Sequence, residues 1–203
     1  MTERTGPSKR ELTRARVIEA AIDCIYEQGF NAAHTNRIAE AAGVSWGVLQ
    51  YHFGDKDGLL QAVLDHIFDN FSATLAATSL EGDELAPRVA QLIDEVWSLV
   101  SRREYRVSMA ILRNAGKDST SAIDGQKQIA LWSRRISQLW DGLFADNIDQ
   151  PRRSEIARHL MFATLRGMAD EINPGSRSDA AIRRELDALA DAITYLLTQH
   201  EAD

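Results

Sequence analysis

The spacing of the apolar residues constrains this 203-residue chain more than any other feature, because they recur every three or four positions almost from end to end. That spacing is the period of the α-helix, and no alternating run long enough for a strand occurs. Four prolines, Pro7, Pro87, Pro151 and Pro174, lie beside other helix breakers. The sequence therefore predicts an all-α fold of about nine helices.

Capping residues place the first of these helices. Ser8 and Glu11 have the spacing of a capping box, and Gly29 suits the end of the helix. The apolar face of this helix consists of Val17, Ala21, Cys24 and Ile25. Cys24 is expected to be a small core residue, with a reactive thiol as the alternative. The expected helices cover residues 8–29, 35–42, 45–53, 56–78, 88–102, 104–115, 121–145, 152–172 and 180–199. Asp55 can cap the fourth of them.

Cysteine use and charge exclude several classes of protein. A single cysteine cannot form an internal disulfide and suits a reducing compartment, so a cytoplasmic location is expected. No run approaches the ~18 apolar residues of a membrane helix, and the polar residues 1–16 do not form a secretory signal. The net charge of −7 argues against nucleic acid at first sight. However, residues 1–60 hold seven Lys and Arg against eight Asp and Glu, so this part is nearly neutral.

Two short helices meet at a glycine turn between residues 35 and 53, which is the helix-turn-helix pattern. Ala39 and Ala42 are small enough for the helices to cross closely, and Gly43 can take the backbone conformation that the turn needs. Ser45 then caps the second helix, whose first residues face DNA bases in this motif. The expected core residues of the second helix are Val48, Leu49 and Phe53.

The motif over Thr35–Lys56 reads Thr-x-x-Ile-Ala-x-x-Ala-Gly-Val-Ser-x-Gly, then His-Phe-x-x-Lys, and Leu59 and Leu60 follow. This order resembles the DNA-binding region of the TetR family of bacterial transcriptional regulators, over about Leu12–Leu64. The resemblance implies a homodimer that binds double-stranded operator DNA through an N-terminal domain, residues 1–56. A helical C-terminal domain, residues 57–203, would bind a small-molecule effector and form the dimer.

The same resemblance implies roles for single residues. Lys56 would meet a phosphate at the start of the next helix, where free N–H groups and the helix dipole favour an anion. Gln50 and Trp46 depart from the family pattern, which has a tyrosine and a polar reader at these places. Gln50 could donate to a phosphate or read an adenine edge, and Trp46 could contact a thymine methyl or cover the groove wall. The expected DNA-binding residues are Thr35, Arg37, Ser45, Trp46, Gly47, Gln50, Tyr51, His52 and Lys56.

The last two segments carry apolar stripes at helical spacing. In the resembled family, the corresponding helices pair with those of a second subunit as a four-helix bundle, which predicts the dimer interface here. The alternative is that the stripes pack only within one subunit. The predicted dimerisation residues are Ile156, Leu160, Ala163, Gly167, Ile182, Leu186, Leu189 and Ile193.

Tryptophan and methionine are spread over the middle segments. These side chains could line an adaptable apolar ligand cavity, or they could be plain core. Arg113 and Asn114 could orient an anionic or carbonyl-bearing ligand, or only bind the carbonyls at a helix end. The expected ligand-binding residues are Trp97, Met109, Arg113, Asn114, Trp132, Trp140 and Met161.

No catalytic constellation is recognisable. None of the five histidines pairs with another at helical spacing, and phosphate-binding loops are absent, so neither a metal nor a cofactor is expected. The sequence predicts a ligand-responsive transcriptional regulator, of which a repressor is the leading form. Neither an enzymatic activity nor contact with a membrane is expected. A DNA-organising or protein-binding relative without a ligand, and a helical enzyme, are the alternatives.

Overall fold

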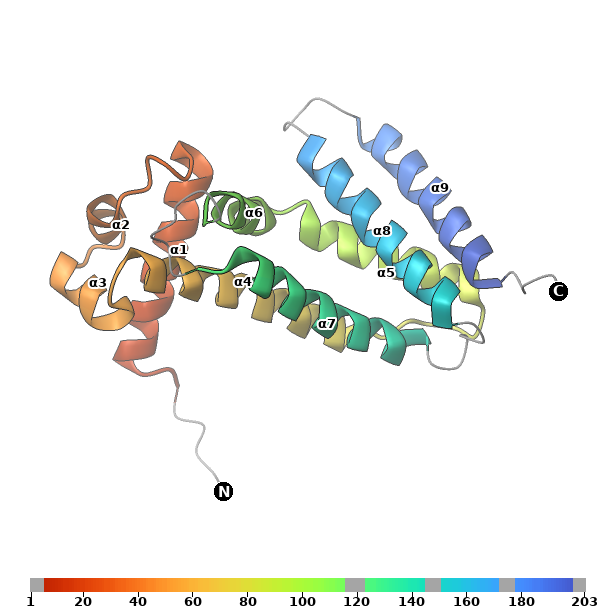
Figure 1. Cartoon of the computed structure of the whole chain (residues 1–203), viewed down its shortest axis with the longest axis horizontal. Coiled ribbons are helices and arrows are strands. Elements are labelled where there is room, and N and C mark those ends of the chain that lie inside the picture. The colour runs from red at the N-terminus through yellow and green to blue at the C-terminus, as the bar shows by residue number, and fades with distance from the viewer. Residues whose placement is uncertain (1–5, 116–122, 145–150, 172–177, 199–203) are drawn as a thin grey trace, which may run out of the picture. The chain divides into compact units, whose positions relative to one another are not determined.

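The computed structural model describes residues 6–115, 123–144, 151–171 and 178–198. Over these residues it contains nine α-helices and no strand, which confirms the predicted all-α fold (Figure 1). The helices are α1 (Lys9–Gln28), α2 (Thr35–Ala41), α3 (Trp46–Phe53), α4 (Lys56–Ala77), α5 (Leu85–Val100), α6 (Arg103–Ala115), α7 (Gly125–Phe144), α8 (Pro151–Glu171) and α9 (Asp179–Thr198).

The capping box at the start of α1 is confirmed. Ser8 Oγ accepts from the N–H of Glu11 at 3.3 Å, and Glu11 Oε2 accepts from the N–H of Ser8 at 2.7 Å. The backbone bond from Ser8 stabilises the ionised carboxylate and lowers the pKa of Glu11. Gly29 ends the helix at φ +83°, a conformation that other residues resist.

Two prolines lie inside helices rather than between them. α5 begins at Leu85, three residues before the predicted start, so that Pro87 falls in its first turn. α8 begins at Pro151 itself. Both positions suit proline, because the first backbone N–H groups of a helix have no partner within the helix. The sequence-based starts were therefore late at both helices.

α7 begins later than predicted. Of the residues expected at its start, 121 and 122 lie outside the described residues, while Ile123 and Asp124 are not helical. Asp124 Oδ1 accepts from the N–H of Lys127 at 3.0 Å and so caps the helix. The helical spacing of the apolar residues extends to the N-terminal side of Asp124, so spacing alone placed the start of the helix too early.

The chain divides into two compact units. The first contains the described residues up to Asn70 and from Arg103 to Ile129, and the second contains Phe71–Arg102 and the described residues from Ala130 onward. The first unit therefore holds α1, α2, α3 and α6, and the second holds α5, α8 and α9. α4 and α7 contribute residues to both units.

α1 is the central helix of the first unit and contacts both α2 and α6. Its apolar face was predicted from Val17, Ala21, Cys24 and Ile25, but Ile18, Ala20 and Ile22 are buried as well. A helix with two partners needs this wider buried face. Cys24 is only 4% exposed, which confirms it as a core residue, and burial raises the pKa of its thiol.

An ion-pair cluster joins α6 to α1. The Arg103 guanidinium at the start of α6 contacts the Asp23 carboxylate and the Glu19 carboxylate of α1, the latter at 3.1 Å. It also donates to Glu104 Oε1 at 3.1 Å, and this bond raises the pKa of Arg103. The cluster fixes which end of α6 lies against α1.

In the second unit, α5 packs on α8 and α9, and α8 packs on α9 (Figure 1). Trp140 of α7 is buried and its Nε1 donates to Ser154 Oγ at 2.7 Å. Arg183 of α9 donates to Asp94 of α5 at 2.7 Å. The buried aromatic ring has its polar atom satisfied, as a tryptophan in a core requires.

Candidate nucleic-acid interface

The turn between α2 and α3 has the geometry that the sequence predicts. Gly43 has φ +62°, and the N–H of Val44 donates to Ala39 O at 3.0 Å. Ala39 and Ala42 are 3% and 4% exposed, as expected at a close helix crossing. Ser45 Oγ accepts from the N–H of Val48 at 3.3 Å, so the predicted cap of α3 is confirmed.

Two residues one helical turn apart hold α3 in place. Leu49 is 1% exposed and Phe53 is 8% exposed, which confirms their predicted core positions. Val48 was also predicted to be a core residue, but it is 36% exposed. The short helix buries a single i, i+4 stripe, and Val48 lies on the neighbouring face. The remaining face of α3 is therefore free to meet a ligand.

The residues predicted to bind DNA lie at the surface. Trp46 is 50% exposed and Tyr51 is 72% exposed, although both are large rings that folding would ordinarily cover. Thr35 and His52 are half-buried. The other predicted residues are exposed: Arg37, Ser45, Gly47, Gln50 and Lys56.

Two of the basic side chains already have partners within the first unit. Arg37 Nη1 donates to Gln28 Oε1 at the end of α1. Lys56 Nζ lies 5.0 Å from the centre of the Phe30 ring, within the range of a cation–π contact. Both charges remain exposed, so these contacts orient them without neutralising them.

The start of α4 is shaped by a tight approach to the end of α3. Asp55 Oδ1 accepts from the N–H of Gly58 at 2.8 Å, which confirms Asp55 as the cap of α4. A Cβ at Gly58 would lie 2.0 Å from the carbonyl oxygen of Phe53. Only glycine fits at this position. The close contact between the backbones of Phe53 and Gly58 fixes the position of Lys56 relative to α3.

Two arginines of α1 extend the interface beyond the predicted residues. Arg14 Nη1 donates to His52 O at 3.3 Å, and its guanidinium lies 4.8 Å from the Phe53 ring centre. The Arg10 guanidinium lies 5.8 Å from the Tyr51 ring centre. The i, i+4 spacing of these two exposed arginines was the available signal, since it places both on one face of α1.

The predicted ligand-binding residues are divided between the two units. Met109, Arg113 and Asn114 belong to α6 in the first unit, where Asn114 Nδ2 donates to Ala110 O at 2.8 Å. Trp140 and Met161 are buried inside the second unit. Trp97 and Trp132 are half-buried there, and Trp97 lines a cavity of about 430 Å³ beside the start of α9.

The predicted dimerisation residues differ in exposure between the two helices. On α8, Ile156 is 50% exposed, Leu160 is 40% exposed, and Ala163 and Gly167 are exposed as well. On α9, Ile182 is half-buried. The remaining residues of that helix are buried inside the second unit: Leu186, Leu189 and Ile193. Of the predicted dimerisation residues, the exposed ones therefore all lie on α8.

The residues that the structure describes also bear on other classes of site. They contain no cluster of three or more His, Cys, Asp or Glu side chains arranged to hold a metal ion. None of the described helices combines the length and the apolar character that a bilayer span requires.

Residues 17–63 match the family model for bacterial regulatory proteins of the tetR family. The chain is also 38% identical over 80 residues to the HTH-type transcriptional regulator BetI of Burkholderia thailandensis. That alignment covers 39% of this chain and 40% of the relative, so the chain matches about two-fifths of the relative's length. The family match covers the exposed helix-turn-helix together with most of α1 and the start of α4.

Solved structures share the fold over nearly the whole chain. A bacterial regulatory protein of the tetR family from Rhodococcus RHA1 is similar with a TM-score of 0.71 at 18% identity, covering 96% of this chain and 100% of that one. The multidrug binding protein EbrR, solved with imidazole, is similar with a TM-score of 0.62 at 20% identity, covering 97% and 99%. At these identities the likeness concerns the fold alone.

Proposed function

Because the chain belongs to the TetR family of bacterial regulatory proteins, we propose that it is a transcriptional regulator that binds operator DNA as a homodimer and is released by a small molecule. It acts as a repressor under this proposal, and it works in the cytoplasm, where its DNA lies. No catalytic step is assigned to it.

The observation that carries this proposal is the exposed start of α3. The buried side chains of Leu49 and Phe53 anchor one face of the helix in the core, and Ser45 caps its start. Its other face presents Trp46, Gly47 and Gln50 to solvent. A capped helix with one anchored and one open face can enter a major groove without rearranging. Gln50 reads an adenine edge and Trp46 contacts a thymine methyl.

Phosphate contacts flank this helix on two sides. Lys56 stands at the first residue of α4, where the helix dipole also attracts an anion. Arg10 and Arg14 lie beside the end of α3, near Tyr51 and His52. Because the first 60 residues are nearly neutral in total, few phosphates are neutralised per subunit and non-specific affinity is modest.

A second copy of the chain supplies the rest of the operator affinity. The exposed apolar stripe of α8 around Ile156 and Leu160 is the surface through which the two copies pair. The α3 helices of the two copies then bind operator half-sites whose centres are about 34–36 Å apart, or a multiple of that distance. An effector that favours another spacing, with a coupling of about 1–3 kcal/mol, lowers operator affinity roughly 5- to 150-fold.

Fluorescence anisotropy with duplexes tiled across the DNA upstream of the chain's own gene tests the proposal. At least one duplex is expected to bind over a thousandfold more tightly than its shuffled sequence at the same salt concentration. Equal affinity for native and shuffled duplexes would favour the DNA-organising alternative. Absence of any duplex binding would overturn the proposal.

A further inference from the structure

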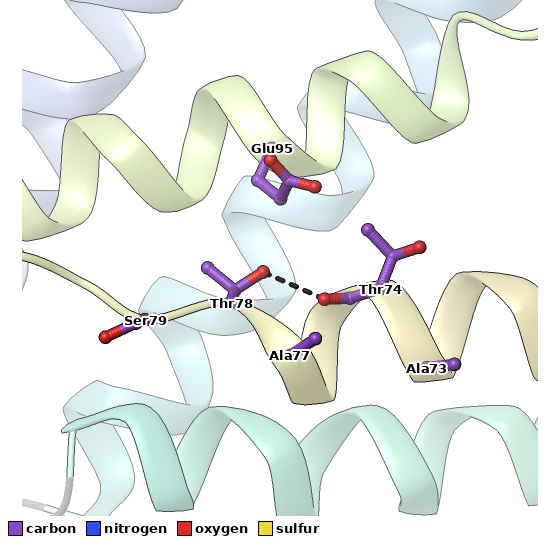
Figure 2. Close-up of a pocket in the computed structure, with 6 residues that line it drawn as sticks. All are labelled: Ala73, Thr74, Ala77, Thr78, Ser79 and Glu95. Atoms are coloured by element: carbon purple, nitrogen blue, oxygen red, sulfur yellow. Dashed lines mark hydrogen bonds between the residues drawn. The ribbon is translucent and has the colours of Figure 1, made fainter.

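The end of α4 and the middle of α5 border a groove of about 600 Å³ in the second unit. Its lining is Ala73, Thr74, Ala77, Thr78, Ser79 and Glu95 (Figure 2). This volume is within the range of about 300–1,000 Å³ that small-molecule sites occupy. None of the ligand-binding residues predicted from the sequence lines it, and we refer to it as the α4–α5 groove.

Among the residues that the structure describes, Glu95 is the only ionisable one in this lining. Its side chain is half-buried, and the structure shows no hydrogen bond or ion pair to its carboxylate among the residues described. Its backbone oxygen, by contrast, accepts from Ser98 Oγ at 2.8 Å. A carboxylate removed from part of its water and left without a cation is unfavourable, so a positively charged group is the partner it lacks.

The end of α4 adds negative potential at the same place. The last carbonyl groups of a helix form the negative end of its dipole, and α4 has no basic residue in its last turn. Thr78 lies directly after that turn, with its N–H donating to Leu75 O at 3.2 Å. The carboxylate and the helix end therefore favour the same sign of ligand charge.

The hydroxyl groups of the groove are arranged to accept hydrogen bonds. Thr78 Oγ1 donates its hydrogen to Thr74 O at 3.0 Å, so its oxygen lone pairs are left to accept from a ligand (Figure 2). Ser79 also lines the groove, with its hydroxyl pointing away from Glu95 (Figure 2). Ala73 and Ala77 supply the apolar part of the surface. A ligand that donates hydrogen bonds and carries a short hydrocarbon part matches this lining.

We propose that the α4–α5 groove binds a protonated amine, whose ammonium group donates to the Glu95 carboxylate and the Thr78 hydroxyl. Its hydrocarbon part rests on Ala73 and Ala77. An anion is repelled by Glu95. A quaternary ammonium has no N–H to donate, and the lining contains no aromatic ring to bind it by a cation–π contact. A divalent metal ion would find a single carboxylate, fewer charged ligands than such ions commonly use.

Calorimetric titration of the full-length protein with three six-carbon probes tests this inference without DNA. Hexylammonium is expected to bind at least tenfold more tightly than trimethylhexylammonium, which has the same charge but no N–H, and hexanoate is expected not to bind. The inference is overturned if hexylammonium fails to bind, or if either of the other two probes binds as tightly.

Two variants locate the site. Glu95→Gln is expected to weaken hexylammonium binding at least tenfold, and Thr78→Val at least threefold, because each removes one acceptor of the ammonium group. Glu84→Gln is the matched control: it removes the same charge just before α5, outside the groove, and should change the affinity less than twofold. Far-UV circular dichroism checks that all variants fold. An affinity unchanged by Glu95→Gln overturns the proposed site.

The regulatory use of this groove rests on the proposed function, and its test is separate. Hexylammonium is added to the protein–operator complex, and the change in operator affinity is measured for the unaltered protein and for Glu95→Gln. A loss of affinity only in the unaltered protein supports the groove as the effector site. Glu95-dependent binding without that loss overturns the effector role and leaves the amine site standing. No operator binding at all overturns the proposed function alone.

Discussion

Single residues at the surface of α3 have separate tasks, and burial distinguishes them. Leu49 and Phe53 are buried and fix the helix, while Trp46 and Tyr51 are large rings left in water. Exposed aromatic rings of this size are unfavourable in isolation and are a common mark of a recognition surface. Substitutions at the exposed positions are therefore expected to alter DNA binding without altering the fold.

Arg14→Ala and Lys56→Ala test the phosphate contacts. Each is expected to weaken binding to all DNA sequences by a similar factor, and to lower the slope of log affinity against log salt concentration by about one. Fluorescence anisotropy over a series of salt concentrations measures both quantities. Arg152→Ala, an exposed arginine at the start of α8, is the control and should leave the slope unchanged. An unchanged slope in Arg14→Ala would show that this arginine serves only to hold α3.

Trp46→Ala tests base reading at the start of α3. The variant is expected to change the order of preference among operator duplexes that differ at single base pairs. At the contacted base pair, it should lose about 1–3 kcal/mol of discrimination between the right and the wrong base. Competition binding against a panel of such duplexes measures the preference. An equal loss of affinity for every duplex would show that Trp46 covers the groove wall without reading a base.

At the level of helices, the tightest fit is the junction of α3 and α4. A Cβ at Gly58 would meet the Phe53 carbonyl oxygen at 2.0 Å, and backbone cannot move aside as a side chain can. Gly58→Ala is therefore expected to lower the free energy of unfolding by about 1–3 kcal/mol. Urea denaturation followed by circular dichroism measures this loss.

Gly142→Ala is the control for that substitution. Gly142 lies within α7, and a Cβ there meets nothing within 4 Å. Alanine favours a helix over glycine, so this variant should be more stable by about 0.5–1 kcal/mol. A loss of stability in both variants would mean that the effect at Gly58 does not come from the contact with Phe53.

Helix interiors and caps were predictable from the sequence, because they depend on residues close together in the chain. Ser8 with Glu11, Ser45 and Asp55 each cap the helix expected of them. The errors in helix bounds lie where one residue is compatible with two different local structures. Pro87 breaks a helix when it is interior but fits the first turn, and the sequence alone does not say which applies.

The residues of the candidate sites were likewise predictable only where they depend on neighbours in the sequence. The exposed residues of α3 follow from a local motif, so they were predictable. The contact of Arg14 with His52 and the placing of Glu95 in a groove with Thr78 depend on which helices pack together. Apolar spacing identifies the buried face of a helix but not its neighbour. The wider buried face of α1, which also includes Ile18 and Ile22, was missed for that reason.

At the scale of the whole molecule, the uncovered apolar surface of α8 predicts self-association. Leu160→Glu places a charge in the proposed interface and is expected to convert a dimer of the unaltered chain into a monomer, as measured by light scattering after size-exclusion chromatography. Leu131→Glu on α7 is the control, since that leucine is 49% exposed and lies outside the predicted stripe. The proposal fails if the unaltered chain is monomeric, or if both variants remain dimers.

The chain leaves the first unit after Asn70 and returns to it at Arg103, where α6 packs on α1 and Arg103 meets Glu19 and Asp23. No single cut in the polypeptide can therefore separate the two units. A chimera that grafted only the first 56 residues onto a foreign sensor would leave the α6 side of α1 open to water. An exchange of sensors in this protein has to replace both segments of the second unit, residues 71–102 and those from 130 onward, with all three crossings of the chain between the units retained.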